Sequence, residues 1–534
     1  MRVDADVAVV GSGFAGSLTA LALRRIGRTV ALVERGCHPR FAIGESSTPL
    51  ANLLLEELAD RYDLPRIRVF SKWGAWQRSR PDVAGGLKRG FTFLFHRQGE
   101  PFDADPGHER QLMVAASPHD DIGDTHWYRP DFDHNLVREA EAAGAIYFDE
   151  TTIDRVTIDR DRSTLEGTRR GQPVSIVAPF VVDASGPRGL LWRVLSLDAP
   201  PLRWLPPTQG LYTHFENVTR WDTPRPDPST PYPADDAAVH HVFPGGWIWM
   251  LRFNNGITSA GAALTDSMAG RITAQAAAPA WDRLLETLPS VREQFVDARA
   301  VRPWIHAPRL AFRTTQVTGP GWALLPSAAG VIDPLLSTGF PLTLLGIQRL
   351  LSILEHSSSG EDREAALRDY ERITLAELDA TEQLVAALYS SMNDVPLFKR
   401  LTLLYFAAAS FSEASRRLNR PDQAPGFLLH AHPVFGRDLH ACVMIALAGP
   451  QGRAREALLE EIDRAIEPFD IAGLLDRSRR DWYPVLADDL VANAHKLRAE
   501  ADDVRRLLER CGFAPSTRHD ESLCDDRGAR TTLR

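Results

Sequence analysis

The sequence predicts an α/β protein: a Rossmann-like β-α-β unit, then an antiparallel sheet, then a helical C-terminal region. Two short apolar runs within residues 6–35 flank a segment with helical spacing, as expected for buried parallel strands joined by a helix. Residues 239–253 and 257–264 alternate as neighbouring antiparallel strands do, with an Asn-Asn-Gly turn between them. From 362 to 510 the pattern is mostly helical, with breaks at prolines near 396, 421 and 450.

Composition excludes several classes of protein. The chain has 534 residues, a net charge of −9, 44% hydrophobic and 25% charged residues, which is ordinary for a globular protein and untypical of a disordered or fibrous one. No broad nucleic-acid surface is expected at this charge. Four scattered cysteines without a CxxC pair indicate neither a disulfide framework nor a metal site, and they fit a cytoplasmic protein. No secretion signal and no apolar run long enough for an integral membrane segment is seen.

The middle of the chain contains both strand and helix patterns. Residues 90–96 alternate as a strand, residues 132–144 are typical of a helix ended by a glycine, and residues 179–183 of a buried strand. The proline-rich stretch 222–236 predicts an irregular loop that acts as a lid or as a docking surface. The polar tail 516–534 is expected to fray.

A glycine-rich motif follows the first strand and predicts a dinucleotide site. Gly11 allows a tight turn, Gly13 lets the backbone approach a pyrophosphate, and Gly16 lets helix and strand pack closely. The following helix start, with Phe14 and Ala15, presents free N–H groups to phosphates. Glu34, followed by Arg35, ends the next strand, where an acid binds ribose hydroxyls. The acid favours FAD or NAD over NADP.

Five further segments resemble the flavin-dependent halogenases, the halogenase branch of the p-hydroxybenzoate-hydroxylase-type FAD oxidoreductases. They are GESSTP at 44–49, RPDFD at 129–133, VDASG at 182–186, WIW at 247–249 and GVIDPLLSTG at 330–339. The resemblance implies FAD as cofactor and one interleaved FAD- and substrate-binding module over 1–360, followed by a helical region over 361–515. Its FAD segments would be about 1–50, 125–200 and 315–360, and its substrate sheet about 85–120 and 205–310.

The resemblance also implies roles for individual residues. Beyond the glycine motif and the acid, the cofactor would contact seven side chains and one glycine: Glu45, Ser46, Ser47, Thr48, Arg129, Asp183, Asp333 and Gly339. A halide would bind near the backbone of Ser337, Thr338 and Gly339, at the start of an apolar helix. A simple helix cap by Ser337 is the plainer interpretation of the same residues.

Three positions depart from the halogenase pattern. The family motif W-x-W-x-I-P ends here in Leu251-Arg252, and Trp247 and Trp249 would either line the substrate pocket or simply share a core-facing side of a strand. Leu336 stands where the tryptophan-specific enzymes have a glutamate, which favours a more apolar or aromatic substrate. Ser327 stands where many relatives have the aspartate that binds the ribityl chain.

Lys88 is the candidate for the lysine that halogenases place between flavin and substrate, and His96 is a candidate pocket base. Each has a plainer alternative, a solvated charge at a strand end and a structural histidine. The predicted function is halogenation of a small aromatic or apolar substrate by reduced flavin, oxygen and halide. An FAD-dependent monooxygenase and a geranylgeranyl-reductase-like flavin reductase are the alternatives. A separate flavin reductase and a carrier protein are possible partners.

Overall fold

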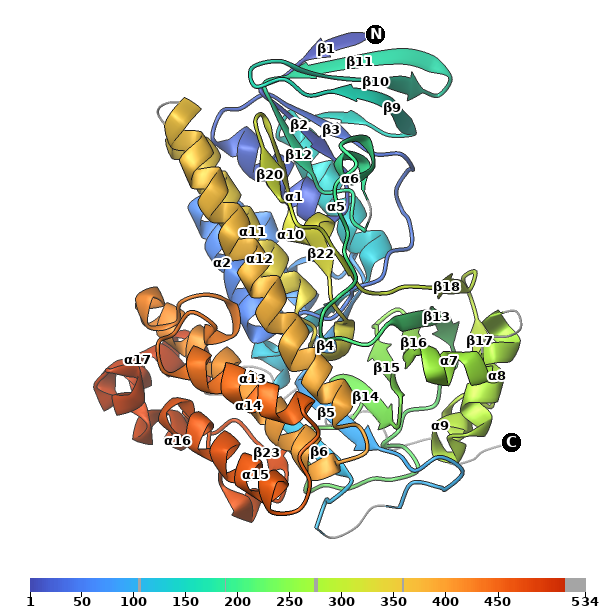
Figure 1. Ribbon diagram of the computed structural model, residues 1–534, viewed down its shortest axis with the longest axis vertical. Helices are drawn as coiled ribbons and strands as arrows, with labels where there is room; N and C mark the ends of the chain where they lie inside the picture. Colours follow the sequence, from blue (N-terminus) through green and yellow to red (C-terminus); the bar gives the residue numbers. More distant parts are fainter. Residues whose placement is uncertain (104–106, 188, 273–276, 358–359, 514–534) are drawn as a thin grey trace, which may run out of the picture.

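The computed structural model describes residues 1–103, 107–187, 189–272, 277–357 and 360–513, so the predicted fraying tail lies outside the described residues. Its upper part in Figure 1 holds a six-stranded sheet, and its lower part holds a nine-stranded sheet. The long helices α11 (Gly339–His356) and α12 (Gly360–Ser390) run between these two parts (Figure 1). The mixed α/β class predicted from the sequence is confirmed.

The six-stranded sheet contains the predicted β-α-β unit. Its order is β20-β21-β12-β2-β3-β8. The strands are β2 (Val7–Val10), β3 (Val30–Val33), β8 (Ile146–Phe148), β12 (Phe180–Asp183), β20 (Thr318–Gly319) and β21 (Trp322–Leu324). Strands β2 and β3 are apolar and buried at every position, as parallel strands covered on both faces must be. Helices α1 (Phe14–Arg25) and α5 (Arg129–Ala142) pack against each other beside this sheet.

A second, four-stranded sheet lies above it in Figure 1 and was not foreseen. It consists of β1 (Arg2–Asp4), β9 (Thr151–Thr157), β10 (Ser163–Arg169) and β11 (Gln172–Ala178). Two further sheets have two strands each. In one, β4 (Gly85–Lys88) pairs with β7 (Asp124–Trp127), and in the other, β19 (Phe312–Arg313) pairs with β22 (Gly330–Val331).

The nine-stranded sheet is mainly antiparallel. Its strands are β5 (Gly90–Phe95), β6 (Gln111–Ala115), β13 (Thr208–Glu216), β14 (Ala238–Phe243), β15 (Gly246–Arg252), β16 (Thr258–Thr265), β17 (Arg299–Ala300), β18 (Ile305–Ala307) and β23 (Trp482–Tyr483). The predicted single strand 239–253 is wrong: it is a hairpin that turns at Pro244-Gly245, where Gly245 has φ +85°. This Pro-Gly pair is itself a turn signal. The 253–257 turn between β15 and β16 lies where the sequence predicts it.

Helices fill the rest of the chain. The shorter ones are α2 (Pro49–Arg61), α3 (Pro65–Arg68), α4 (Trp73–Ser79), α6 (Leu190–Val194), α7 (Asp266–Ile272), α8 (Ala277–Glu286), α9 (Pro289–Gln294) and α10 (Pro326–Ala329). The C-terminal ones are α13 (Val395–Arg417), α14 (Phe435–Leu447), α15 (Arg453–Ile466), α16 (Ala487–Ala492) and α17 (Ala501–Arg510). The three predicted proline breaks fall at helix starts or between helices. The C-terminal region is not purely helical, because β23 pairs in parallel with β6 at the edge of the large sheet.

The two faces of the nine-stranded sheet belong to different cores. Phe91, Phe93 and Phe95 point to the inner face, where Phe93 and Phe95 contact Phe398 of α13. The alternate residue Leu94 points to the outer face, into a separate core. The face of the sheet on which a side chain lies therefore decides which of the two cores it joins.

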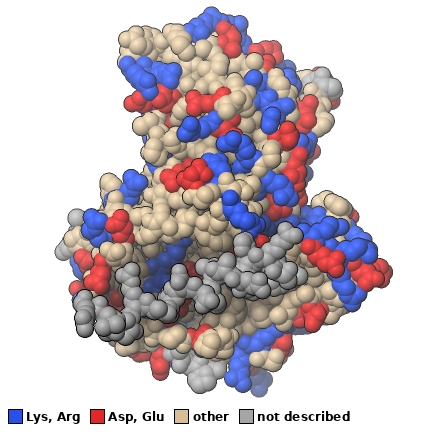
Figure 2. Space-filling view, turned by 180° about the vertical axis from the view of Figure 1, so that it is seen from behind, with Lys and Arg blue, Asp and Glu red and all other residues tan. Residues whose placement is uncertain are grey.

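None of the described helices combines the length and apolar character needed to cross a bilayer. Figure 2 shows basic and acidic side chains interspersed over the upper part of the rear face.

Candidate active site

The glycine turn after β2 forms a cradle that only glycine permits. Gly11 has φ +98°, and a Cβ there would lie 2.5 Å from the carbonyl oxygen of Ala184. At Gly13, the nearest atom to an added Cβ is a guanidinium nitrogen of Arg40 at 3.4 Å. Gly13 is also the N-cap of α1 and supplies no side-chain hydrogen bond, so the first N–H groups of this helix are open to an anion.

Glu34 is held ionised beside this turn. Its Oε2 accepts hydrogen bonds of 3.1 Å from both the backbone N–H and the hydroxyl of Ser12, and its Oε1 accepts one of 3.0 Å from Gly36 N. Burial opposes the charge, but Arg40 and these hydrogen bonds together hold the pKa of Glu34 below its ordinary value. Ser12 and Arg40 were missed by the sequence analysis, whereas Arg35 is exposed.

Arg129 connects three segments at the glycine turn. It forms a bidentate ion pair with Asp133, at 2.7 and 2.8 Å, and donates to the carbonyl oxygens of Ile43 (3.1 Å) and Gly44 (2.8 Å). Its guanidinium carbon lies 5.1 Å from the ring centre of Phe14. The segment before GESSTP is thereby tied to the start of α1.

The side chains of GESSTP have partners within the protein, and their contact with a cofactor stays a prediction. Ser47 donates to the carbonyl of Thr125 (2.7 Å), and Thr48 is the N-cap of α2, accepting from Ala51 N at 3.2 Å. Glu45 Oε1 lies 2.8 Å from His214 Nε2, with both side chains fully buried.

Two of the predicted polar cofactor residues lie at the carboxyl end of β12. The carboxylate of Asp183 accepts from Ser185 N (2.8 Å) and Leu191 N (2.7 Å) and so fixes the start of α6, while its role in binding the cofactor stays a prediction. Burial raises its pKa. Ser327 lies nearby on α10, since Leu325 N donates to the carbonyl of Asp183 at 2.9 Å.

The segment 333–339 leads into α11 with an uncapped helix start. Ser337 has φ +53°, in the left-handed region, and is not the cap. Thr338 is the N-cap, without a side-chain hydrogen bond. Apart from the neighbouring residues and the backbone of its own helix, no atom of the described residues lies within 4 Å of a Cβ placed on Gly339. The first N–H groups of this 18-residue helix therefore face open space, which suits a halide or a flavin carbonyl. Leu336 is fully buried.

The start of α11 meets the start of α1. The ring centres of Phe14 and Phe340 lie 4.8 Å apart, and Trp127 stacks on Phe340 at 4.2 Å. The open helix start at 338–339 and the glycine turn therefore belong to one region of the molecule.

Lys88 is fully buried, so the interpretation as a solvated surface charge is wrong. Its Nζ donates to Ser46 Oγ (2.8 Å) and to the carbonyl of Ser47 (2.6 Å), and lies 3.7 Å from the ring centre of Phe91. Burial is the main cause that lowers the pKa of Lys88 to about 7, against the opposing charge of Asp124.

Aromatic side chains on the inner face continue from Lys88 toward the helix start at 338. Phe91 and Phe93 stack on His240, with ring centres 5.8 and 4.4 Å away, and His240 stacks on Trp247 at 5.2 Å. Burial lowers the pKa of His240 to about 3, so this ring is neutral. His240 carries no motif in the sequence, and only the alternation along its strand could have placed it.

Trp247 begins a hydrogen-bond chain that ends at Asp333. Its indole N–H donates to Tyr389 Oη (3.1 Å), and Tyr389 Oη donates to Asp333 Oδ2 (2.9 Å). Asp333 Oδ1 accepts from Leu335 N at 3.0 Å. Burial raises the pKa of Asp333 to about 7. The Asp333 side chain thus holds the 333–336 turn, and its contact with the cofactor stays a prediction.

His96 lies on the outer face and not beside Lys88, so the two predicted site residues do not meet. Its Nε2 is 2.9 Å from His241 Nδ1, and its ring packs against Trp221. The strand alternation that points Phe93 and Phe95 inward points His96 outward. Trp249 does share the inner face with Trp247, and its indole N–H lies 3.4 Å from Ser259 Oγ.

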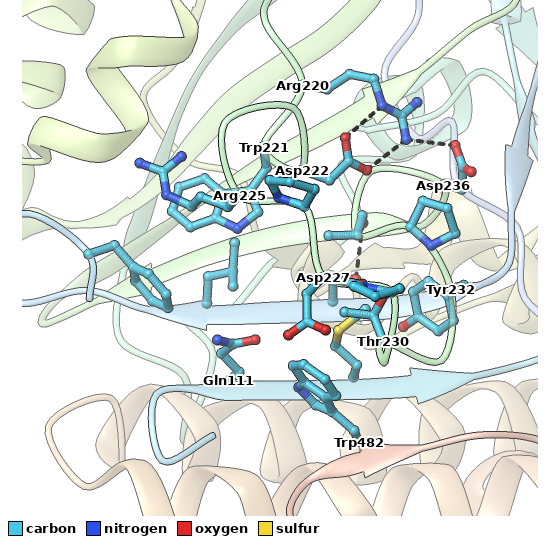
Figure 3. A pocket seen from close by; sticks show the side chains of 18 residues that line it. Gln111, Arg220, Trp221, Asp222, Arg225, Asp227, Thr230, Tyr232, Asp236 and Trp482 are labelled. Atoms are coloured by element: carbon cyan, nitrogen blue, oxygen red, sulfur yellow. Dashed lines mark hydrogen bonds and ion pairs between the residues drawn. The ribbon is translucent and has the colours of Figure 1, made fainter. Parts of the chain in front are cut away.

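A cavity of about 670 Å³ also lies on the outer face (Figure 3). The sheet contributes Leu94, Gln111 and Met113 to its wall, and the proline-rich loop 222–236 contributes Tyr232 and Asp227. This loop covers the face opposite Lys88, so it is not a lid over that lysine.

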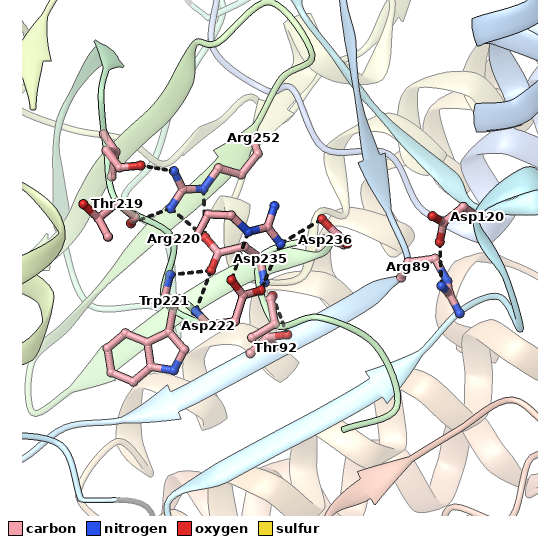
Figure 4. A network of polar contacts seen from close by, with 12 residues as sticks. Arg89, Thr92, Asp120, Thr219, Arg220, Trp221, Asp222, Asp235, Asp236 and Arg252 are labelled. Atoms are coloured by element: carbon pink, nitrogen blue, oxygen red, sulfur yellow. Dashed lines mark hydrogen bonds and ion pairs between the residues drawn. The ribbon is translucent and has the colours of Figure 1, made fainter. Parts of the chain in front are cut away.

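Arg252 occupies the position where the family motif has proline, and it anchors the same loop (Figure 4). Its Nε donates to Asp235 at 2.8 Å, and its terminal nitrogens donate to the carbonyls of Val218 (2.5 Å) and Thr219 (2.9 Å). Leu251 remains on the inner face, where it keeps the aliphatic character of the family's isoleucine. The departure at 251–252 therefore changes the outer face more than the inner one.

Comparison with known proteins decides the family. The profile of the tryptophan halogenase family matches residues 126–446, which is more than half of the chain. The chain belongs to this family. A profile of NAD(P)-binding Rossmann-like domains matches residues 9–51 of this halogenase, across the glycine turn and Glu34.

Named relatives and solved structures agree with this family assignment. Monodechloroaminopyrrolnitrin halogenase PrnC of Pseudomonas fluorescens is 30% identical over 74% of this chain and 69% of its own length. Tetracycline 7-halogenase of Kitasatospora aureofaciens is 29% identical over 78% and 75%. The crystal structure of halogenase PltM with phloroglucinol and FAD superposes with a TM-score of 0.80, at 26% identity, over 89% of this chain and 99% of PltM.

The halogenase is an FAD-dependent oxidoreductase, and its residues fit that cofactor. The glycine cradle leaves room that a side chain at Gly13 would take, and the ionised Glu34 is an acceptor for ribose hydroxyls.

Proposed function

We propose that this halogenase places a halogen on an electron-rich aromatic small molecule held between Lys88 and the start of α11. The observation that carries the proposal is the full burial of the Lys88 ammonium against the ring of Phe91, in a chain whose family is halogenating. A lysine that is wholly desolvated without a direct ion pair is costly and is typical of functional sites.

When bound and reduced, FAD would supply, with O₂ as the oxidant, the chemistry that converts a halide into an electrophilic halogen. The residues of the chain do the rest. The open N–H groups at 338–339 would bind the halide, because a helix start attracts anions. Lys88 Nζ, oriented by Ser46 and Ser47, would direct the halogen by hydrogen bonding toward the substrate. The aromatic side chains would exclude water from this route.

The substrate class follows from the inner face. Phe91, Phe93, His240 and Trp247 offer ring faces and edges for stacking, and Leu336 places an apolar side chain where the tryptophan-specific enzymes have a glutamate. A phenol or pyrrole fits this surface better than free tryptophan does. Phloroglucinol, a phenol bound by the structural neighbour PltM, is the first substrate to try.

Two partners belong to the proposal. We infer a separate flavin reductase in the cytoplasm as the source of reduced flavin, in keeping with the halogenase resemblance. A carrier-bound substrate is the second option, supported by a relative named as a chlorinase of a pyrrole on a peptidyl-carrier protein.

The test supplies phloroglucinol, bromide or chloride, FAD, and a flavin reductase with its nicotinamide donor to the full chain in air, and it records product masses. Halogenated product that needs Lys88 is expected: Lys88→Met should reduce turnover by about 10³-fold or more while FAD still binds. Lys496→Met, a lysine of the C-terminal region that donates to the carbonyls of Glu467 and Asp470, is the matched control. A product that gains only one oxygen and ignores halide would instead indicate the monooxygenase.

A further inference from the structure

Lysine is scarce in this chain, and its placement is uneven. Only Lys72, Lys88, Lys399 and Lys496 are lysines among the 61 basic residues, and the rest are arginines. Two of the four, Lys72 and Lys88, lie beside one carboxylate, that of Asp124. Unlike arginine, lysine changes its protonation readily when its surroundings change. The pair of lysines at one buried acid is therefore a specific arrangement.

Asp124 faces Lys88 across a strand pair. The two residues are directly opposite in the register of β4 and β7, and in an antiparallel pair opposite residues share a face with Cβ atoms about 5 Å apart. Lys88 is fully buried and Asp124 is 1% exposed. At this separation, inside a dry core, each charge acts strongly on the other.

The remaining contacts of Asp124 hold it in place. Its Oδ1 accepts a 2.8 Å hydrogen bond from the amide of Asn52 and lies 3.7 Å from Lys72 Nζ, whose side chain is partly exposed. Its Oδ2 has no hydrogen-bond partner among the described residues. Burial raises the pKa of Asp124, and the charge of Lys72 and the hydrogen bond from Asn52 oppose that shift. Asn52 also fixes the carboxylate, and Lys72 brings its counter-charge from the solvent side.

Other ionisable groups surround the pair. His126 of β7 and His240 of β14 are fully buried near Lys88, and burial lowers the pKa of each imidazole, so both stay neutral. Glu413 and Tyr405 of α13 interact electrostatically with Asp124, and burial raises the pKa of Tyr405. Among these described neighbours, Asp124 is therefore the acid placed directly opposite Lys88.

We propose that Asp124 is a positioning residue that sets the protonation of Lys88, and that Lys72 keeps the Asp124 carboxylate charged. The proposal rests on the function proposed above for Lys88. An ionised Asp124 stabilises the ammonium form of Lys88, so the lysine retains its hydrogen-bonding protons near neutral pH. Without that anion, desolvation alone would favour the neutral amine.

Four lysines make a direct measurement practical. The FAD-loaded full chain, labelled with ¹³C at lysine Cε, should give one resonance per lysine, and substitution of each lysine by arginine assigns them. We expect Lys88 to titrate near neutrality and Asp124→Asn to move its midpoint at least one pH unit lower, a tenfold change in the equilibrium. Asp120→Asn, which removes a 60% exposed acid paired with Arg89, is the matched control and should leave the midpoint unchanged.

A measurement on the unaltered protein covers the case in which Asp124→Asn does not fold. Because Lys72 and Lys88 flank one acid, the Lys72 resonance should show a step at the pH where Lys88 titrates, and the Lys496 resonance should not. An unchanged Lys88 midpoint in Asp124→Asn, or no shared step in the unaltered protein, would overturn the proposal.

The two proposals fail in distinguishable ways. If Lys88→Met keeps full halogenation, the role of Lys88 fails, whatever the resonances show. If Lys88→Met is inactive but Asp124→Asn leaves the Lys88 midpoint in place, only the role of Asp124 fails. When both proposals hold, the pH profile of halogenation in Asp124→Asn moves to lower pH, as the Lys88 midpoint does.

Discussion

Tyr389 Oη donates a 2.9 Å hydrogen bond to Asp333 Oδ2, joining the end of α12 to the turn that precedes α11. The same hydroxyl accepts from the indole of Trp247 at 3.1 Å. One tyrosine from the helical C-terminal region thus connects the nine-stranded sheet to the helix start where a halide would bind.

Tyr389→Phe should lower the free energy of unfolding by about 1–3 kcal/mol, because Asp333 and Trp247 each lose a partner in a dry core. Urea denaturation measures this. Tyr370→Phe, which removes a 2.8 Å hydrogen bond to the carbonyl of Leu324 from the same helix, is the control. The halide concentration for half-maximal turnover should rise in Tyr389→Phe and stay constant in Tyr370→Phe. Equal halide dependence in the two variants would contradict the positioning role.

Asp333 should make stability depend on pH. Its pKa in the folded protein is about 7, above the ordinary 3.8, so the folded state binds the proton more tightly than the unfolded one. Its contribution is complete below pH 4 and is lost as the pH rises to 7, by a few kcal/mol at about 1.4 kcal/mol per pH unit. The stability of Asp333→Asn relative to the unaltered protein should therefore improve over this range. Parallel stability curves would exclude this titration.

Gly11→Ala and Gly13→Ala should fail differently. A Cβ at Gly11 would lie 2.5 Å from a backbone carbonyl at φ +98°, so this variant should lose several kcal/mol of stability. A Cβ at Gly13 meets its nearest neighbour at 3.4 Å, so that variant should fold and bind FAD at least tenfold more weakly, because the methyl takes the space for the pyrophosphate. Thermal unfolding and flavin titration distinguish the two, and normal FAD affinity in Gly13→Ala would place the cofactor elsewhere.

Arg252→Ala should loosen the proline-rich loop without abolishing chemistry. It leaves the fully buried carboxylate of Asp235 without its ion-pair partner, a loss of about 3 kcal/mol. Limited proteolysis should cut faster within 222–236, while halogenation at saturating substrate is kept. Arg299→Ala, which breaks an exposed pair with Glu216, should change neither. Loss of halogenation in a folded Arg252→Ala would connect the outer face to catalysis.

The sequence predicts the parts of the site whose residues lie close together along the chain. The glycine turn and Glu34 lie within one β-α-β unit, where strand, helix and acid follow at fixed spacing. Tyr389, His214 and Arg40 could not be found in this way, because tertiary packing of distant segments decides their partners. The separation of His96 from Lys88 could not be predicted for a related reason: alternation shows that residues share a face, but it does not say which face meets the cofactor.

The pairing of Trp482 and Tyr483 with β6 has a bearing on protein engineering. A chimaera that takes its last helices from another halogenase would also exchange an edge strand of the nine-stranded sheet. A recombination point after residue 483 therefore keeps this strand pair within one parent. A point in the linker between α12 and α13 would separate the two strands, although that linker looks like a domain boundary.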